Sequence, residues 1–169
     1  MVLMPKIYLD SDMIIAMGKE DMPQEEQTAL QVVHRAAKSG KCEIYTSQVT
    51  AEEIAPYKGE RKPAIEDVYE ATSKVPFADR QKLLGIHSFG DRYTWINSPM
   101  IEDNQEWLRI RALGLADKDA HHVMLASHAE CNVLLTHDGG LLHRANAIQQ
   151  TYRVLVMRPT ALCNEMNWS

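Results

Sequence analysis

The chain has 169 residues, of which 45% are hydrophobic and 24% are charged, proportions that are ordinary for one soluble globular domain. Its formal net charge is −5, from 18 Lys and Arg against 23 Asp and Glu. This balance argues against broad electrostatic attraction to nucleic acid, but it leaves room for a phosphate contact made through a bound metal ion.

The three cysteines form no Cys-x-x-Cys pair, and their odd number favours buried thiols in a reducing compartment. The first ten residues contain no apolar run of signal-peptide length, and no later run is long enough to cross a membrane. We therefore expect a cytoplasmic protein with no membrane partner.

Short apolar strands alternate with helical patterns along the chain. Strands are expected at 6–10, 42–47, 132–136 and 153–157. Helices are expected at 23–40, from 50, at 101–115, at 117–130, at 139–150 and after Pro159. Residues 56–100 form a middle segment whose pattern is partly helical and partly irregular. Continuous apolar strands separated by helices predict an α/β fold, with a parallel sheet covered on both faces in a single domain spanning 1–169.

Acidic residues follow the expected strands or open the helices that come after them. They are Asp10, Asp12, Glu52, Glu53, Asp117, Asp119 and Asp138. Because ligands of open parallel sheets gather beyond the carboxyl ends of the strands, we expect these acids at one rim. Clustered carboxylates repel one another and some stay protonated unless a cation neutralises them. Such a cluster suits Mg²⁺ or Mn²⁺, which prefer oxygen ligands.

Helix capping is the alternative explanation for several of these acids. Thr50 and Glu53 have the spacing of a capping box, and Asp138 stands before two glycines as a turn residue or cap would. Asp117 is well placed as the N-cap of its helix, which leaves Asp119 available for other work.

Asp10 is expected to have no capping role, because Ser11 and Asp12 are better placed as caps. Asp10 is therefore one of the two acids for which a functional role is the simpler interpretation, together with Asp119.

Four short blocks together resemble the PIN-domain ribonucleases, the family that includes the VapC-type toxins. In chain order the blocks are Leu9-Asp10-Ser11, Ser47-Gln48-Val49-Thr50-Ala51-Glu52-Glu53, Asp119-Ala120-His121-His122 and Thr136-His137-Asp138. The spacing in the second block selects Glu53 rather than Glu52. The ending "RVLVMRPTAL" (153–162) also resembles the last strand and the Pro-initiated turn of that family. The resemblance covers both ends of the chain and leaves residues 56–100 without support.

The resemblance implies a three-layer α/β/α sandwich around a mostly parallel sheet of about five strands, as in PIN domains. It also implies a Mg²⁺- or Mn²⁺-dependent endoribonuclease that hydrolyses RNA phosphodiester bonds. Its metal ligands would be Asp10, Asp119 and Asp138, with Glu53 as a further ligand or as the group that orients the attacking water. Ser11, Asp12 and Thr136 would surround and steady these carboxylates. The implied partners are an RNA substrate, an antitoxin protein and a second copy of the chain.

Asp12 departs from the family, which usually has Asn at this position. Asp10-x-Asp12 also resembles the opening of haloacid-dehalogenase-like phosphatases, in which Asp10 would be a covalent nucleophile and Asp12 its acid/base partner. The late acids do not form the acidic pair of that family. A third interpretation is a PIN-fold module that binds without hydrolysis, which the lack of a basic patch favours.

Five histidines lie close to two of the motifs: His121, His122, His128, His137 and His143. No two of them have His-x-x-x-His spacing, so zinc is the weaker interpretation. We expect His121 and His128 to be rim residues. Trp95, Met100 and Trp107 fit core or interface packing.

Overall fold

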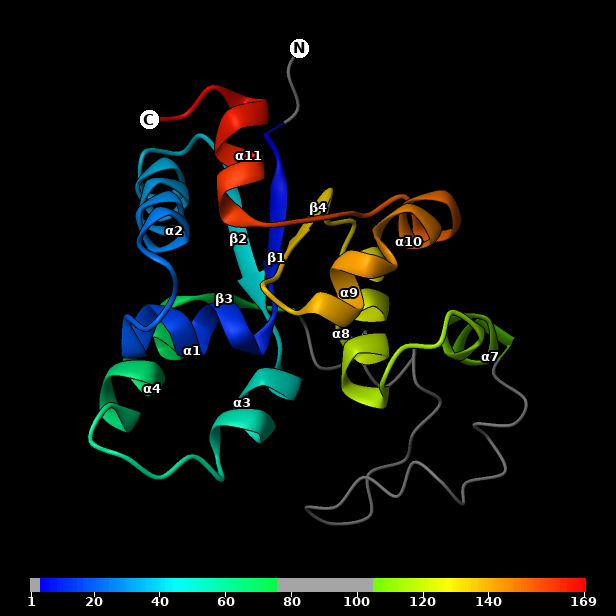
Figure 1. Ribbon diagram of the computed structural model, residues 1–169, viewed down its shortest axis with the longest axis horizontal. Coiled ribbons are helices and arrows are strands. Elements are labelled where there is room, and N and C mark those ends of the chain that lie inside the picture. Colours follow the sequence, from blue (N-terminus) through cyan, green and yellow to red (C-terminus); the bar gives the residue numbers. More distant parts are fainter. Residues whose placement is uncertain (1–3, 76–104) are drawn as a thin grey trace.

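The computed structural model of the chain describes residues 4–75 and 105–169 (Figure 1). Within these residues the strands form one five-stranded, all-parallel sheet in the order β3-β2-β1-β4-β5. The strands are β1 (Lys6–Leu9), β2 (Glu43–Thr46), β3 (Ser73–Lys74), β4 (Val133–Leu135) and β5 (Leu155–Met157). The α/β class and the parallel sheet are confirmed. The expectations for Trp95, Met100 and the rest of 76–104 lie outside the described residues.

Helices connect these strands and cover both faces of the sheet. They are α1 (Ser11–Lys19), α2 (Gln24–Lys38), α3 (Gln48–Ile54), α4 (Lys62–Ala71), α7 (Gln105–Ala112), α8 (Asp117–His128), α9 (Gly139–His143), α10 (Ala145–Tyr152) and α11 (Pro159–Met166). The helix expected at 139–150 is interrupted at Arg144, which ends α9 and caps α10. None of the described helices combines the length and apolarity that crossing a membrane requires.

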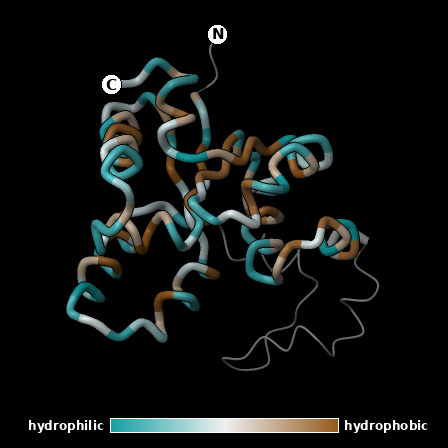
Figure 2. Tube along the Cα trace, in the orientation of Figure 1, coloured by the Kyte–Doolittle hydropathy of each residue, from teal (hydrophilic) through white to brown (hydrophobic). Residues whose placement is uncertain are grey.

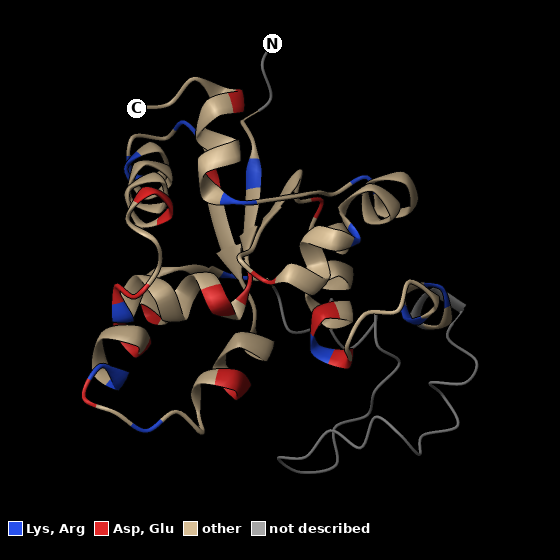
Figure 3. Cartoon of the chain, viewed as in Figure 1, with Lys and Arg blue, Asp and Glu red and all other residues tan. Residues whose placement is uncertain are grey.

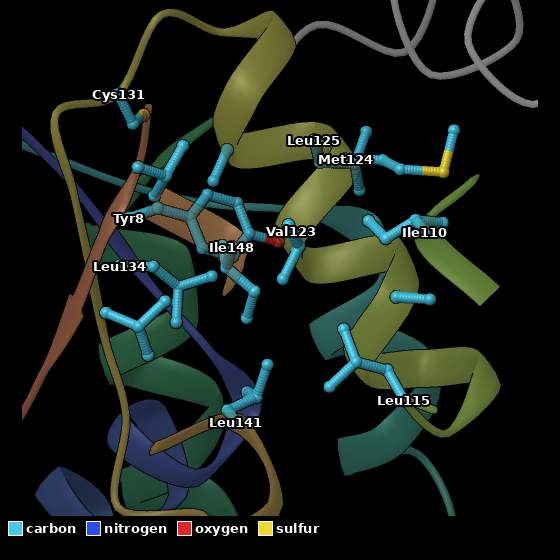
Figure 4. Close-up of a cluster of buried hydrophobic side chains, with 14 of the residues drawn as sticks. Tyr8, Ile110, Leu115, Val123, Met124, Leu125, Cys131, Leu134, Leu141 and Ile148 are labelled. Atoms are coloured by element: carbon cyan, nitrogen blue, oxygen red, sulfur yellow. The ribbon is translucent and has the colours of Figure 1, made fainter. Parts of the chain in front are cut away.

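Alternate residues of β1 point to opposite faces of the sheet and enter two separate apolar clusters. Tyr8 joins Leu134 and residues of α8 and α10 in one cluster (Figure 4). Ile7 and Leu9 join residues of α1, α2, α4 and α11 in the other. Hydrophobic positions accordingly concentrate on the strands and on helix faces turned toward them (Figure 2). The result is the three-layer sandwich.

Two contacts join neighbouring helices on the face of the sheet that α1 and α2 cover. Gly18 lets α1 approach α4 closely, because a Cβ at this position would lie 2.6 Å from the backbone of Ile65. The buried carboxylate of Glu26 accepts hydrogen bonds from the Thr160 hydroxyl at 2.7 Å and the Thr160 N–H at 3.1 Å, so it caps the first turn of α11.

The strand order reverses between β1 and β4. From β1 the chain builds β2 and β3 on one side, and it later adds β4 and β5 on the other. In open α/β sheets the crevice beyond the carboxyl ends at such a reversal is the usual ligand site. The residues that leave β1 and β4 meet there, and the backbone N–H of Asp10 donates to the carbonyl of Leu135 at 3.3 Å.

Candidate active site

Asp10 occupies the turn between β1 and α1, with only 3% of its surface exposed. One carboxylate oxygen, Oδ1, accepts a hydrogen bond from the Met13 N–H at 3.0 Å, so Asp10 is the N-cap of α1. The expectation that it has no capping role is therefore wrong. Ser11 and Asp12 already belong to the helix, and the extended backbone of Asp10 is the one that suits a cap. Each carboxylate oxygen keeps a further lone pair, so capping does not exhaust its ligand capacity.

Thr136 ties the ends of β1 and β4 together. Its hydroxyl donates to Oδ2 of Asp10, and the Thr136 hydroxyl oxygen itself accepts the Asp138 N–H at 2.9 Å. This is the hydroxyl contact expected of Thr136. The side chain of Asp138 accepts the Leu141 N–H at 3.0 Å, which confirms the prediction that Asp138 caps the following helix. The four residues hold the two strand ends in one hydrogen-bonded unit.

Asp119 and Asp138 both lie beside Gly140. A Cβ added to Gly140 would stand 2.9 Å from Oδ1 of Asp138 and 4.0 Å from Oδ2 of Asp119. A side chain at position 140 would therefore press on one carboxylate and approach the other. Gly140 thus leaves room for the carboxylates of Asp119 and Asp138 to lie near each other.

Asp119 is the third residue of α8, whose N-cap is Ala116. The prediction that Asp117 caps this helix is wrong, because Asp117 lies inside the first turn and forms an ion pair with Arg111. Burial and the neighbouring charge of Asp138 raise the pKa of Asp119 to about 6. A carboxylate at N3 normally gains from the helix dipole, so its raised pKa reflects the neighbouring acids and the loss of hydration.

The same physical causes act on the two acids of the β1–α1 turn. Burial raises the pKa of Asp10 to about 7, against the favourable charge of His122 and the hydrogen bond from Thr136. Desolvation and the carboxylates of Asp138 and Glu53 raise the pKa of Asp12, which lies at the exposed rim. Acidic positions at the strand-proximal end of α1, on α3 and at the start of α8 lie beyond the carboxyl ends of the strands (Figure 3). The site therefore concentrates negative charge that the described side chains do not fully neutralise.

Glu53 is the exception among these acids. Its Oε2 lies 3.0 Å from Nε2 of His122, and its Oε1 lies 3.6 Å from Nζ of Lys118. Burial raises the pKa of Glu53, but the hydrogen bonds from His122 and Ser11 and the charges of His122 and Lys118 outweigh it, so the pKa lies below its usual value. Unlike Asp10, Asp12 and Asp119, Glu53 therefore has a pKa that is shifted toward the ionised form.

The capping box predicted for α3 is wrong. The helix begins earlier, at Gln48, which places Thr50 inside its first turn. There the Thr50 hydroxyl bonds to the Thr46 hydroxyl at 2.8 Å, and Glu53 turns to His122 instead. Glu53, the acid selected by the motif spacing, contacts His122 and Lys118 of α8.

Three functional candidates were not singled out by the sequence: Tyr8, Ser47 and His122, which connect to Glu53 by hydrogen bonds. Ser47 and His122 lie inside two of the motif blocks, so the motifs could have drawn attention to them, but the motifs assigned them no role. The expectation that His121 lies at the rim is wrong, because it is 2% exposed and packs within the molecule. His128, expected at the rim as well, is exposed.

Within residues 4–75 and 105–169, no group of three or more His, Cys, Asp or Glu side chains has its donor atoms placed to hold a metal ion. The donor chemistry nevertheless fits Mg²⁺ or Mn²⁺, since Asp10, Asp119 and Asp138 offer oxygen ligands and two of them have raised pKa values. Mg²⁺ commonly keeps several waters and binds through one or two carboxylates, so a closed protein cage is not required.

Comparison of the chain with protein-family models, with curated proteins and with solved structures found no match. The α/β architecture and the acidic rim therefore rest on the chain's own geometry. The similarity of its motifs to PIN-domain ribonucleases stays a prediction.

Proposed function

We propose that the protein is a Mg²⁺- or Mn²⁺-dependent endoribonuclease of the PIN type. The observation that carries the proposal is the meeting of Asp10, Glu53, Asp119 and Asp138 from four distant segments, at the strand-order reversal of a parallel sheet. Burial and mutual repulsion raise the pKa values of Asp10 and Asp119, which is the electrostatic state that a divalent cation would relieve. The preference for RNA over other phosphodiesters is supported by the motif resemblance.

In this proposal Asp10, Asp119 and Asp138 hold the ion, directly or through its waters. The bound ion supplies Lewis-acid stabilisation of the charge that develops on the phosphoryl oxygens. Glu53, with its lowered pKa, is ionised at neutral pH and orients the attacking water or takes its proton. Lys118, with its side chain 60% exposed beside Glu53, adds a positive charge at the rim, where an approaching phosphate would pass.

The phosphatase alternative is disfavoured by the surroundings of Asp10. In that alternative an oxygen of Asp10 would attack the phosphorus atom, but Oδ1 accepts the Met13 N–H and Oδ2 accepts the Thr136 hydroxyl, and both hydrogen bonds lower nucleophilicity. The non-catalytic binding module is the alternative that the absence of a preformed three-ligand group among the described residues favours.

The test is cleavage of a mixed pool of structured RNA by purified protein, titrated with Mg²⁺ and with Mn²⁺, with EDTA as the metal-free control. Asp119→Asn is the test variant. Asp117→Asn is its matched control, because it makes the same chemical change two residues earlier on α8, where Asp117 pairs with Arg111. We expect cleavage that needs metal, is lost in Asp119→Asn and persists in Asp117→Asn.

Three outcomes would overturn the proposal. Cleavage that survives EDTA, or an Asp119→Asn protein with the wild-type rate, would contradict a carboxylate-held metal. A folded protein that binds Mn²⁺ by calorimetry but cleaves no RNA would favour the binding module.

We further propose that the protein acts as the toxin of a toxin–antitoxin pair and forms a homodimer, on the strength of the resemblance. Expression of the wild-type chain in a bacterial host is then expected to arrest growth, while Asp10→Asn is expected not to. Light scattering of the purified protein measures the oligomeric state, and a monomer at micromolar concentration would contradict the dimer.

A further inference from the structure

A chain of hydrogen bonds runs from the apolar interior to Glu53. The Tyr8 hydroxyl lies 2.6 Å from Oγ of Ser47 and 2.8 Å from Nδ1 of His122, and Nε2 of His122 lies 3.0 Å from Oε2 of Glu53. Tyr8 belongs to β1 and His122 to α8. Ser47 is the N-cap of α3, and Glu53 lies within α3. Tyr8, Ser47 and His122 are each at most 1% exposed. Water therefore has little access to the hydrogen bonds that link Ser47, Tyr8 and His122.

The available protons decide which atom donates in each bond. An ionised carboxylate can only accept hydrogen bonds, so Nε2 of His122, 3.0 Å from Oε2 of Glu53, must carry a proton and donate it. If His122 is neutral, its Nδ1 accepts the proton of Tyr8, and Ser47 donates to Tyr8. If His122 is positively charged, its Nδ1 donates to Tyr8, and Tyr8 donates to Ser47. The bond from His122 to Glu53 is the same in both arrangements.

The Tyr8 hydroxyl holds this series of hydrogen bonds in place, because it bonds to both Ser47 and His122. The Tyr8 ring lies in the cluster that contains Val123, Leu134 and Ile148 (Figure 4), where a phenylalanine would fill the same space without needing a polar partner. The His122 ring packs against it, with the ring centroids 5.6 Å apart and tilted by 58°. Because Tyr8 belongs to the central strand, it fixes the imidazole to the sheet rather than to a surface loop.

Glu53 itself needs such a constraint. It lies near the end of α3, a helix of seven residues, and a glutamate has three rotatable side-chain bonds that solvent would leave free. Its Oε1 lies beside Lys118, and its charge acts on Asp12 and Asp119. Holding Oε2 therefore directs the carboxylate toward the acidic cluster.

We propose that His122 is a positioning residue, which Tyr8 and Ser47 orient through Nδ1 and which holds Glu53 in its working direction through Nε2. The inference rests on the proposed function, because the working direction is that of the group that orients the attacking water. A hydrogen bond made before substrate arrives spares the site from reorganising at the moment of reaction. In this role His122 does not contact the substrate.

Two amide variants of His122 separate its contact with Tyr8 from its contact with Glu53. In His122→Gln the amide nitrogen reaches about as far as Nε2 and can still donate to Glu53. In His122→Asn the shorter side chain reaches about as far as Nδ1, so it can meet Tyr8 but not Glu53. We expect kcat to fall about 10- to 100-fold in His122→Asn with KM changed less than about threefold, and most of the loss to be restored in His122→Gln.

A double-mutant cycle with Glu53→Gln tests whether His122 acts through Glu53. Each single variant is expected to lower kcat, whereas adding His122→Asn to Glu53→Gln should change kcat less than about twofold. Independent, multiplicative effects would overturn the inference. His128→Asn, on the same helix but exposed, is the matched control and should keep the wild-type kcat. Melting temperatures of all variants show whether a loss of rate is merely a loss of folded protein.

A spectroscopic measurement separates this inference from the proposed function. In ¹⁵N spectra of the imidazoles, assigned with His122→Asn, we expect a protonated Nε2 whose proton exchanges slowly, and faster exchange in Glu53→Ala and Tyr8→Phe. If this signal is present and RNA is not cleaved, the hydrogen-bond chain stands and the nuclease fails. If RNA is cleaved and His122→Asn has the wild-type kcat, the nuclease stands and the positioning role fails. An unprotonated or rapidly exchanging Nε2 would also overturn the role.

Discussion

Two buried carboxylates, Glu26 and Asp10, make nearly the same contacts in two regions of the molecule. Glu26 accepts the hydroxyl and the N–H of Thr160 at the first turn of α11. Asp10 accepts the hydroxyl of Thr136 and the N–H of Met13 at the first turn of α1. Each acid thereby joins the beginning of the chain to its last third, and each satisfies a helix N-terminus.

The difference lies in what surrounds the two acids. Glu26 belongs to α2 and bonds to α11, next to the apolar cluster that contains Ala29 and Cys163. Asp10 stands where two strand ends meet, with the carboxylate of Asp12 nearby, and its pKa is raised to about 7. A buried acid that caps a helix is therefore a structural element by itself. A buried acid that lies among other carboxylates adds to an excess of negative charge, which makes it a candidate for binding a cation.

The largest expected effect is on RNA cleavage, which should depend on Asp10 but not on Glu26. Asp10→Asn should lower metal-dependent RNA cleavage by roughly 100-fold or more, because charge stabilisation by a bound ion is worth several kcal/mol in the transition state. Glu26→Gln should leave cleavage by the folded protein within about twofold. Initial rates at saturating Mg²⁺ measure both. Equal losses in the two variants would remove the distinction between the regions.

The next effect is the pH dependence of stability. The pKa values of Asp10 and Asp119 are higher in the folded state, about 7 and about 6, than the ordinary value of 3.8. The folded protein therefore binds more protons between about pH 4 and pH 7, so its free energy of unfolding should fall as the pH rises through this window, by up to about 1.4 kcal/mol per pH unit for each group.

Urea unfolding at a series of pH values, without divalent metal, measures this slope. Asp10→Asn and Asp119→Asn should each flatten it and should make the protein more stable than the wild type at pH 8. Asp117→Asn, whose residue pairs with Arg111, serves as the control. A wild-type stability that rises between pH 4 and pH 7 would contradict the raised pKa values.

The third expected effect is on stability, where Glu26→Gln tests the structural role of Glu26. The amide keeps one acceptor oxygen but loses the charge that the first turn of α11 favours, so we expect a loss of about 2 kcal/mol in the free energy of unfolding. Thr160→Val removes the hydroxyl partner, and the double variant should cost less than the sum of the two. Strict additivity would mean that the contact contributes nothing of its own.

The smallest expected effect is stabilisation by a metal ion. Free Mn²⁺ at ten times its Kd should add about 1.4 kcal/mol to the free energy of unfolding, measured as a rise in Tm. The rise should be larger at pH 8 than at pH 5, where protons compete for Asp10 and Asp119, and it should disappear in Asp119→Asn. It should persist in Glu26→Gln. A rise that is equal at both pH values would point to binding elsewhere.

Local patterns predicted most of the fold, and the exceptions have identifiable causes. β3 was not expected because its two residues are too few to show a strand pattern, and the neighbouring β2 defines it through the pairing of Tyr45 with Ser73. The break at Arg144 was missed because the apolar pattern of 139–150 continues through it. Helix boundaries also decided the errors about capping, since α3 begins two residues earlier than the pattern suggested.

Residue chemistry and spacing by themselves determined the α/β class, the parallel sheet and the acids at the ends of β1 and β4, because periodicity and side-chain type are written along the chain. Only the tertiary structure decided the strand order, the hydroxyl link from Thr136 to Asp10, and the path from Tyr8 through His122 to Glu53. These contacts join residues 126, 114 and 69 positions apart. No local pattern encodes such pairs, because they exist only once packing has brought distant segments together.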